Sequence, residues 1–178
     1  GSGSAGNHMA FALEKLVDKI VLTDISKKAL KRSKNSIYIP RYKRWSKKIS
    51  LNLEGKDKNI LYDAIVIASP PDTHLNLIRK NINKSKIFLI EKPICEPNKK
   101  TINQFEKIIN THKNKIFLCG YNHRLFPSTI MFKKILKQQK NNFDFIEIKF
   151  KENTEGFLKA HNWYKSLSDS YLSKTKRG

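Results

Sequence analysis

Residues 63–74 read DAIVIASPPDTH, a short apolar run that ends at two prolines. Five consecutive apolar residues, 64–68, are typical of a strand buried in a parallel sheet. The strand must stop where the prolines begin, because proline has no amide hydrogen for the ladder. We expect Asp72 or Thr73 to cap the helix that follows. The apolar stripe of this helix consists of Leu75, Ile78 and Ile82.

An apolar run followed by a helical pattern recurs on both sides of this stretch. Residues 35–59 show no clear pattern. Strands that alternate with helices are typical of β-α-β units around a parallel sheet, so the sequence predicts an α/β fold of the doubly wound type. The further strands are predicted at 20–23, 86–90 and 116–119, and the further helices at 6–18, 26–34, 102–109 and 126–139.

Residues 143–151 follow a different pattern, because apolar and charged side chains alternate along them. One apolar and one polar face are typical of an antiparallel strand with a solvated side. We therefore predict a parallel-sheet domain at 1–120 and the beginning of an α+β domain at 121–178.

The chain has 178 residues, enough for one domain and the beginning of a second. Its formal net charge of +21 raises the alternative of a nucleic-acid or polyanion binder. The lysines are spread along the whole chain, so we do not favour this alternative. The densest basic stretch, RYKRWSKK at 41–48, is interpreted as a solvated loop, with a nucleic-acid site as the alternative.

Two features bear on where the protein works. No apolar run is long enough to span a membrane, and no signal peptide is visible. The two cysteines, Cys95 and Cys119, suit a reducing compartment, and we interpret both as small core residues and not as nucleophiles. We therefore expect a cytoplasmic location and no metal site.

Residues 1–6 read GSGSAG and fit the pattern G-x-G-x-x-G through Gly1, Gly3 and Gly6. The glycines of this pattern allow a tight turn, a close approach of backbone N–H groups to a pyrophosphate, and close helix packing. The positive end of the following helix would point at the phosphates. A Gly-Ser run that precedes a methionine is also typical of an expression tag, and this alternative stays open. We favour a native loop because a helix of suitable length begins directly at Gly6.

Asp24 ends the next predicted strand, about 20 residues beyond the glycines, where a carboxylate would hydrogen-bond the adenosine ribose. Its charge would repel a 2′-phosphate and favours NAD over NADP. Lys27, Lys28 and Arg32 lie close by in the sequence, so NADP is kept as an alternative cofactor. The alternative interpretation of Asp24 is a helix-capping residue. The pattern indicates a Rossmann-type fold, and we expect its first strand to precede Gly1 and to be missing from this sequence.

Three later motifs resemble the glucose-fructose oxidoreductase and inositol dehydrogenase family, written Gfo/Idh/MocA, whose members depend on NAD(P). The motifs are SPPDTH at 69–74, EKP at 91–93 and GYNHRLFP at 120–127. Each follows a predicted parallel strand, at the edge where open parallel sheets bind ligands. Their order and spacing carry the resemblance, which covers essentially the whole chain.

The resemblance implies roles for individual residues. Ser69, Pro70 and Glu91 would line the cofactor site, with His74 close by at the start of a helix, although a structural role is the alternative for His74. Lys92 would reach the substrate hydroxyl and the nicotinamide region, where its ammonium could orient the hydroxyl whose carbon gives up hydride. The alternative for Lys92 is a surface lysine beside a turn proline.

Further implied residues lie where the second domain begins. Tyr121, Asn122 and Arg124 would offer hydrogen bonds to sugar hydroxyls. The segment from His161 to Gly178 resembles the family segment that leads to a glycine cluster, and the acid/base histidine of the family lies beyond that cluster.

The function implied by the resemblance is hydride transfer between a nicotinamide cofactor and a sugar, cyclitol or nucleotide-sugar carbon. We expect this sequence alone to be inactive, because the acid/base histidine is absent, and poorly stable, because a central strand is absent. The resemblance also implies a homo-oligomer formed through a C-terminal sheet. The alternative functions are polyanion binding and a dinucleotide-binding sensor without turnover.

Overall fold

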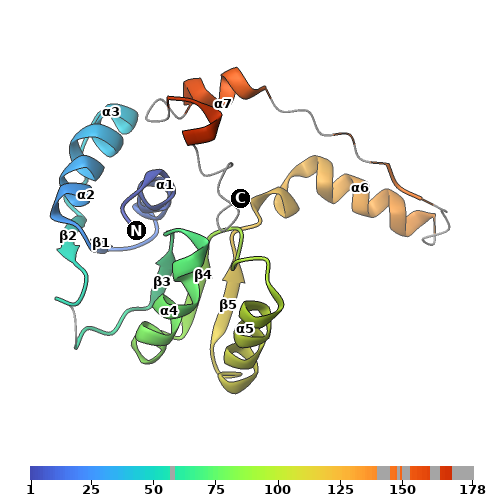
Figure 1. The fold of residues 1–178 in the computed structure, drawn as a ribbon, viewed down its shortest axis with the longest axis horizontal. Coiled ribbons are helices and arrows are strands. Elements are labelled where there is room, and N and C mark those ends of the chain that lie inside the picture. The colour runs from blue at the N-terminus through green and yellow to red at the C-terminus, as the bar shows by residue number, and fades with distance from the viewer. Residues whose placement is uncertain (57–58, 140–144, 148, 150–152, 161–164, 170–178) are drawn as a thin grey trace. The chain divides into compact units, whose positions relative to one another are not determined.

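The computed structural model of this protein describes residues 1–56, 59–139, 145–147, 149, 153–160 and 165–169. The chain divides into two compact units, Gly1–Gly120 and Tyr121–Gly178, and each is described by itself (Figure 1).

The first unit alternates helices and strands along the chain, as a doubly wound fold requires. Its helices are α1 (Ser4–Leu13), α2 (Lys27–Arg32), a π-helix (Ser33–Tyr38), α3 (Ile39–Tyr42), α4 (Pro71–Asn81), a 3-10 helix (Ile82–Lys84) and α5 (Lys99–Thr111). Its strands are β1 (Ile20–Asp24), β2 (Ile49–Leu53), β3 (Ala64–Ile67), β4 (Ile87–Ile90) and β5 (Ile116–Cys119).

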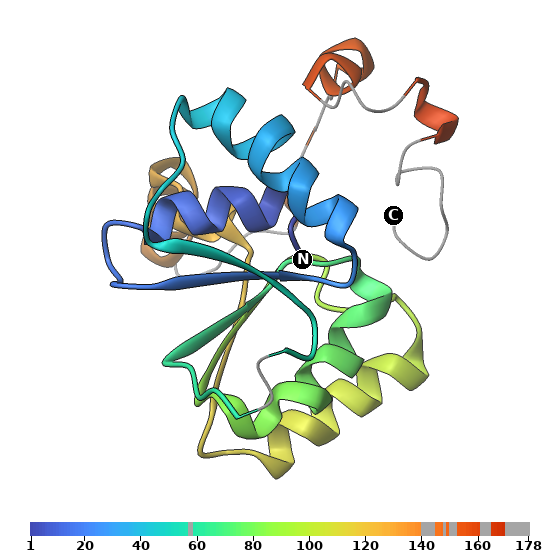
Figure 2. The same cartoon turned by 90° about the vertical axis from the view of Figure 1, so that its left-hand side faces the viewer.

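The strands form two parallel sheets, one of β1 and β2 and one in the order β3-β4-β5. The helices α1 and α2 pack on the first sheet and α4 on the second, with α5 beside α4 (Figure 2). This arrangement confirms the predicted α/β fold. Among the described residues β1 and β3 are not paired with each other, and the chain's first residues lie at the carboxyl ends of both strands.

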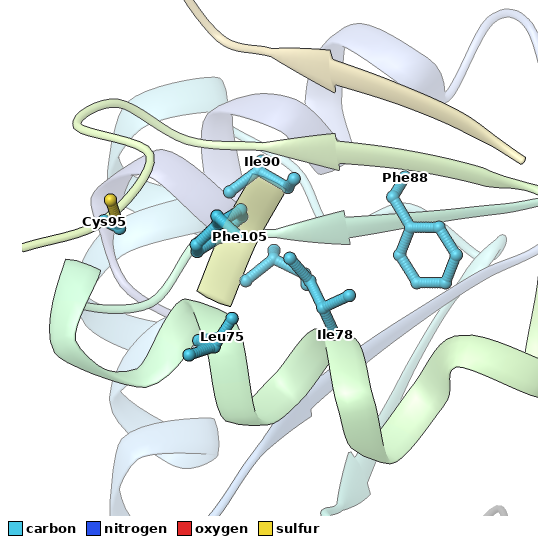
Figure 3. Close-up of a cluster of buried hydrophobic side chains, with 7 residues drawn as sticks. Leu75, Ile78, Phe88, Ile90, Cys95 and Phe105 are labelled. Atoms are coloured by element: carbon cyan, nitrogen blue, oxygen red, sulfur yellow. The ribbon is translucent and has the colours of Figure 1, made fainter. Parts of the chain in front are cut away.

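The larger core lies between the β3-β4-β5 sheet and the helices α4 and α5 (Figure 3). Ile78, Phe88 and Ile90 are fully buried there, and each contributes roughly 1.5–3 kcal/mol by leaving water. The predicted stripe of α4 faces this core, since Leu75 is 8% exposed and Ile82 packs against the cluster. Cys95 is also buried in it, which agrees with its predicted role as a small core residue.

The smaller core joins α1 to the basic stretch 41–48 through aromatic rings. Tyr42 stacks on Phe11 with ring centroids 3.8 Å apart, and Trp45 meets the fully buried Tyr38 edge to face. The prediction of a solvated loop at 41–48 is confirmed for its five cations, which are all exposed, but it is wrong for its aromatic residues, which pack against a core.

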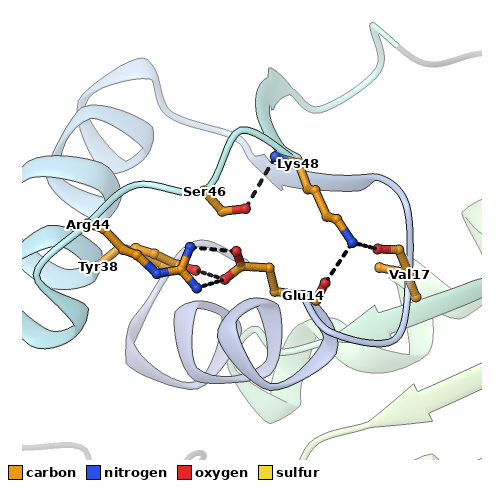
Figure 4. A network of polar contacts seen from close by, with 6 residues as sticks. All are labelled: Glu14, Val17, Tyr38, Arg44, Ser46 and Lys48. Atoms are coloured by element: carbon orange, nitrogen blue, oxygen red, sulfur yellow. Dashed lines mark hydrogen bonds and ion pairs between the residues drawn. The ribbon is translucent and has the colours of Figure 1, made fainter.

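Arg44 and Lys48, two of the five cations of this stretch, make hydrogen bonds within the protein although both stay exposed (Figure 4). The Arg44 guanidinium donates two hydrogen bonds to the Glu14 carboxylate, and the Lys48 ammonium donates to the backbone carbonyls of Glu14 and Val17. Both cations stay exposed, and their hydrogen bonds to Glu14 and Val17 give no positive support to a nucleic-acid site at 41–48.

Several predicted boundaries change in the structure. The helix predicted at 26–34 continues through a π-helix and α3 to Tyr42, and β2 forms within the stretch that showed no clear pattern. The predicted cap at Asp72 or Thr73 is wrong, because α4 already begins at Pro71. Proline suits the first helical position, where an amide hydrogen would have no partner inside the helix.

The second unit contains a 3-10 helix (Asn122–Leu125), α6 (Pro127–Gln138), α7 (Thr154–Ala160) and a 3-10 helix (Leu167–Asp169). The helix α6 confirms the one predicted at 126–139. Of the strand predicted at 143–151, only residues 145–147 and 149 are described, and these belong to no strand. The segment from His161 to Gly178 is described only at 165–169. None of the described helices is long and apolar enough to cross a membrane.

Candidate functional site

The glycine turn at residues 1–6 is an integral part of the fold. Ser2 is fully buried, and its backbone N–H and its hydroxyl both donate to one oxygen of the Asp24 carboxylate, at 2.9 and 2.7 Å. Gly3 is the N-cap of α1, and Ser4 begins the helix two residues before the predicted start. Such integration is not expected of an appended tag, so the native interpretation of the glycine run is favoured.

The three motif glycines meet different surroundings. A methyl group on Gly6 would collide with the carbonyl oxygen of Gly1, and one on Gly1 would lie 2.5 Å from the carbonyl oxygen of Ala68. A methyl group on Gly3 would instead point into space with no protein atom within 4 Å. Gly1 and Gly6 therefore permit close backbone packing, while Gly3 borders open space at the start of α1.

Asn7 holds the glycine turn in place, a role that the motif did not indicate. The side chain is fully buried, and its amide nitrogen donates to the carbonyl oxygens of Ser2 and Gly3 at 2.9 and 2.8 Å. Its amide oxygen accepts a hydrogen bond of 3.0 Å from the buried Ser33 hydroxyl. With these carbonyls bound to Asn7, the turn is formed before any ligand arrives. No sequence signal pointed to this role, because the burial of Asn7 and its carbonyl partners are seen only in the structure.

Asp24 ends β1 beside this turn, as predicted. Burial of the carboxylate acts to raise its pKa, but the hydrogen bonds from Ser2 and from the Ser26 backbone together outweigh burial, and the pKa of Asp24 lies below its ordinary value. The carboxylate is therefore ionised at neutral pH. Ser26 caps α2 by accepting from the Ala29 amide, so the alternative role of Asp24 as the helix cap is not supported.

The loop after β3 carries Ser69 and Pro70. The Ser69 hydroxyl lies 2.6 Å from that of Thr73, which in turn donates to the Pro70 carbonyl at 2.7 Å. Pro70 is exposed, and Gly1 packs against the neighbouring Ala68. The loop therefore lies next to the glycine turn.

His74, on α4, is fully buried. Its Nε2 lies 2.7 Å from the Ser69 carbonyl oxygen and its Nδ1 lies 3.0 Å from the Ile94 carbonyl oxygen. A side chain with this burial can contribute to a cofactor site only through the loops that it holds.

Glu91 and Lys92 follow β4 at the same edge of the sheet. The Glu91 amide donates to the Ile67 carbonyl at the end of β3, and the Gly120 amide donates to the Ile90 carbonyl. A methyl group on Gly120 would lie 3.4 Å from the Glu91 carboxylate, so a glycine leaves room for this carboxylate. Lys92 is exposed and precedes a cis peptide bond to Pro93.

The carboxyl ends of the parallel strands thus bring most of the predicted residues to one edge of the first unit. Tyr121, Asn122 and Arg124 belong to the second unit, where all three are exposed. The predicted residues at the edge are Gly1, Gly3, Gly6, Asp24, Ser69, Pro70, Glu91 and Lys92.

The geometry fits a dinucleotide. The first turn of α1 has no side-chain cap among the described residues, and its backbone N–H groups begin at the open space beside Gly3. A helix start of this kind suits a pyrophosphate, and an ionised carboxylate at the end of the next strand suits the ribose hydroxyls.

Comparisons with known proteins agree with this geometry. No curated protein sequence matches the chain. Among solved structures, myo-inositol 2-dehydrogenase from Lactobacillus plantarum is 19% identical with a TM-score of 0.65, and the match covers 97% of this chain and 50% of that one. Scyllo-inositol dehydrogenase from Lactobacillus casei, with bound NAD(H) and scyllo-inositol, is 23% identical with a TM-score of 0.61, covering 79% and 40%.

The WlbA dehydrogenase from Thermus thermophilus, in complex with NAD and UDP-GlcNAcA, is 16% identical with a TM-score of 0.54, covering 94% of this chain and 55% of that one. At these identities the likeness shows the fold, and the chain spans about half the length of these enzymes or less.

The family match is more direct, because it rests on the sequence. Residues 1–123 match the family described as "Oxidoreductase family, NAD-binding Rossmann fold". This span includes the glycine turn, Asp24 and the motifs at 69–74 and 91–93. The chain therefore belongs to the oxidoreductase family with an NAD-binding Rossmann fold, the Gfo/Idh/MocA family.

Proposed function

We propose that this chain supplies the cofactor site of an NAD-dependent dehydrogenase that acts on a sugar, a cyclitol or a nucleotide sugar. The observation that carries the proposal is the open space at Gly3, at the uncapped start of α1. Ser2, the residue before Gly3, donates two hydrogen bonds to the Asp24 carboxylate at the end of β1. The pyrophosphate would bind to the backbone N–H groups at the start of α1. The bound nicotinamide would accept or donate the hydride.

Asp24 supports NAD as the preferred cofactor. An ionised carboxylate accepts hydrogen bonds from the ribose hydroxyls and repels a phosphate at the 2′ position. The pKa of Asp24 lies below its ordinary value, so this repulsion persists at neutral pH. Lys27, Lys28 and Arg32 of α2 are exposed, and none of the described ion pairs involves them, so NADP is the alternative cofactor.

Lys92 is the proposed residue that contacts the substrate. It is exposed at the carboxyl end of β4, at the edge where the glycine turn lies against β3. An ammonium there would orient the hydroxyl whose carbon exchanges hydride. Glu91 would contribute to the cofactor site at the same edge.

The substrate class rests on relatives. Scyllo-inositol and UDP-GlcNAcA are bound in two similar structures, and both ligands carry several hydroxyl groups. We propose Tyr121, Asn122 and Arg124 as hydrogen-bonding residues for such a substrate. A homo-oligomer and a cytoplasmic location stay predictions.

A titration with NADH tests the proposal, using Gly3→Ala as the decisive variant. The added methyl group meets no protein atom, and Gly3 has φ −75°, so alanine fits its backbone. The methyl group would instead occupy the proposed pyrophosphate space and displace its hydrogen bonds, which we expect to weaken NADH binding at least about tenfold.

Gly156→Ala is the matched control, because a methyl group there makes only ordinary contacts at 3.7 Å or more. We expect this variant to bind NADH like the unmodified protein, and both variants to melt at or slightly above its melting temperature. Unchanged NADH binding by Gly3→Ala would refute the proposed cofactor site.

A further inference from the structure

His74 makes two contacts that no hydride-transfer step requires. One ring nitrogen faces the carbonyl oxygen of Ser69, in the loop after β3, and the other faces the carbonyl oxygen of Ile94, two residues after Lys92. The ring is fully buried, and the residues whose carbonyls it faces, Ser69 and Ile94, are half-buried. A single side chain thus lies between the two loops that carry the proposed cofactor and substrate residues.

These loops belong to neighbouring strands of one sheet. The strands β3 and β4 pair in register from Ala64 with Ile87 to Ile67 with Ile90, and the Glu91 amide adds the last ladder bond to Ile67. Beyond that bond, no ladder contact joins residues 69–74 to residues 92–95 among the described residues. The His74 ring spans this gap through its two carbonyl contacts.

The opposite end of the same two strands has a comparable contact. The buried Ser85 hydroxyl lies 3.1 Å from the Asp63 carbonyl oxygen before β3 and 3.0 Å from the Ile87 carbonyl oxygen of β4. Both ends of the strand pair are therefore joined by one buried polar side chain. Only the His74 end carries the proposed site, which makes Ser85 a matched control.

We infer that His74 is a positioning residue that couples the Ser69 loop to the Lys92 loop and so fixes the position of Lys92 relative to the cofactor. This inference rests on the proposed function for the meaning of the two loops. The physical coupling rests only on the two distances and the burial of the ring. His74 itself touches neither cofactor nor substrate.

Two substitutions separate the two contacts. A neutral imidazole has a single N–H, so it donates to one of these two carbonyl oxygens and only faces the other. Asparagine places its amide nitrogen near the position of Nδ1, so His74→Asn keeps the contact with the Ile94 carbonyl and loses the contact with the Ser69 carbonyl. Glutamine places its amide nitrogen near the position of Nε2, so His74→Gln keeps the contact with the Ser69 carbonyl and loses the contact with the Ile94 carbonyl. Both side chains are uncharged amides, so the pair is matched in chemistry.

Amide hydrogen exchange measures the loops directly, without cofactor. We expect His74→Gln to raise exchange in residues 92–96 about fivefold to tenfold while residues 68–73 change little, since the contact with the Ile94 carbonyl in that loop is lost. His74→Asn should give the reverse pattern. Ser85→Ala is the control for a loss of overall stability, so the variants are compared at temperatures where their free energies of unfolding are equal. Under this condition we expect Ser85→Ala to leave the exchange of both loops unchanged. Equal exchange in both His74 variants, or exchange like that of Ser85→Ala, would overturn the inference.

NADH affinity supplies the functional readout. We expect His74→Asn, which frees the Ser69 loop, to weaken NADH binding about fivefold or more, and His74→Gln to bind within about twofold of the unmodified protein. Equal NADH affinities in the two variants would contradict the coupling to the cofactor site. If the unmodified protein fails to bind NADH while the exchange pattern appears as expected, the proposed function fails and the link between the loops stands.

The unmodified protein offers a measurement that needs no substitution. NADH added to it should slow exchange at residues 92–96 as well as at residues 68–73, because the two loops move together. Protection confined to residues 68–73 would overturn the inference even if neither His74 variant folds.

Discussion

Replacing Asn7 by alanine should both loosen the glycine turn and destabilise the protein. The side chain makes three buried hydrogen bonds, two to the carbonyls of Ser2 and Gly3 and one from Ser33. Each such bond contributes about 1 kcal/mol, so their loss costs about 3 kcal/mol. Alanine recovers about 0.5 kcal/mol through its higher helix propensity. We therefore expect the free energy of unfolding to fall by about 2.5 kcal/mol.

Ser33→Ala separates the contribution of the Ser33 hydrogen bond from the total loss of stability caused by Asn7→Ala. It removes only the bond to Asn7, so we expect a loss of about 1 kcal/mol. The two substitutions should not add, because they share this bond, and the double variant should show a coupling energy of about 1 kcal/mol. Asn76→Ala is the control for residue type, because Asn76 is exposed in the middle of α4 and its loss should be neutral or slightly stabilising.

Urea unfolding of the unmodified protein and the four variants, followed by a titration with NADH, tests these expectations. Asn7→Ala should also bind NADH more weakly, because the freed carbonyls of Ser2 and Gly3 let the turn leave its binding geometry. A destabilisation of Asn7→Ala below about 0.5 kcal/mol, like that of Asn76→Ala, would refute the argument that Asn7 holds the turn. A large destabilisation with unchanged NADH affinity would refute its link to the cofactor site.

Two further predictions concern ionisable groups. Burial and the hydrogen bond to Glu14 raise the pKa of Tyr38 from 10.0 to about 12, so the stability that this group contributes is full below pH 10 and is lost as the pH rises through 12. The difference in free energy of unfolding between the unmodified protein and Tyr38→Phe, measured with urea, should therefore narrow over this range. A constant difference would contradict the assignment. The hydrogen bonds to Asp24 lower its pKa below 3.8, so its contribution is present above that pH and is lost as the pH falls further. In Asp24→Asn, the part of the free energy of unfolding that depends on acid pH should be absent. The same variant should have a higher ratio of NADPH to NADH affinity, and an unchanged ratio would show that Asp24 does not select the cofactor.

The fold of the first unit was largely predictable because its strands differ sharply in composition from its helices. Residues 64–68 and 116–119 are short apolar runs bounded by proline or glycine, and both form strands where predicted. β2 was missed although apolar and polar residues alternate along Ile49–Leu53, a pattern typical of a strand, because this run lies in a lysine-rich stretch that otherwise shows no clear pattern. Its strand character comes from pairing with β1.

The basic stretch 41–48 shows why composition misled. Five cations in eight residues predict a solvent-exposed loop when only the local sequence is considered, yet Arg44 and Lys48 bind acceptors in the turn after α1. Those acceptors lie about thirty residues earlier in the chain, so no local pattern points to them.

What the sequence determined by itself was the order of elements and the placing of Asp24, Ser69 and Lys92 at strand ends, because strand ends are marked by local chemistry and parallel strands share one carboxyl edge. Only the tertiary structure decided which side chains hold that edge together. Asn7 and His74 act through backbone carbonyls that they reach by folding, and a carbonyl is the same in every residue, so its partner leaves no trace in the sequence.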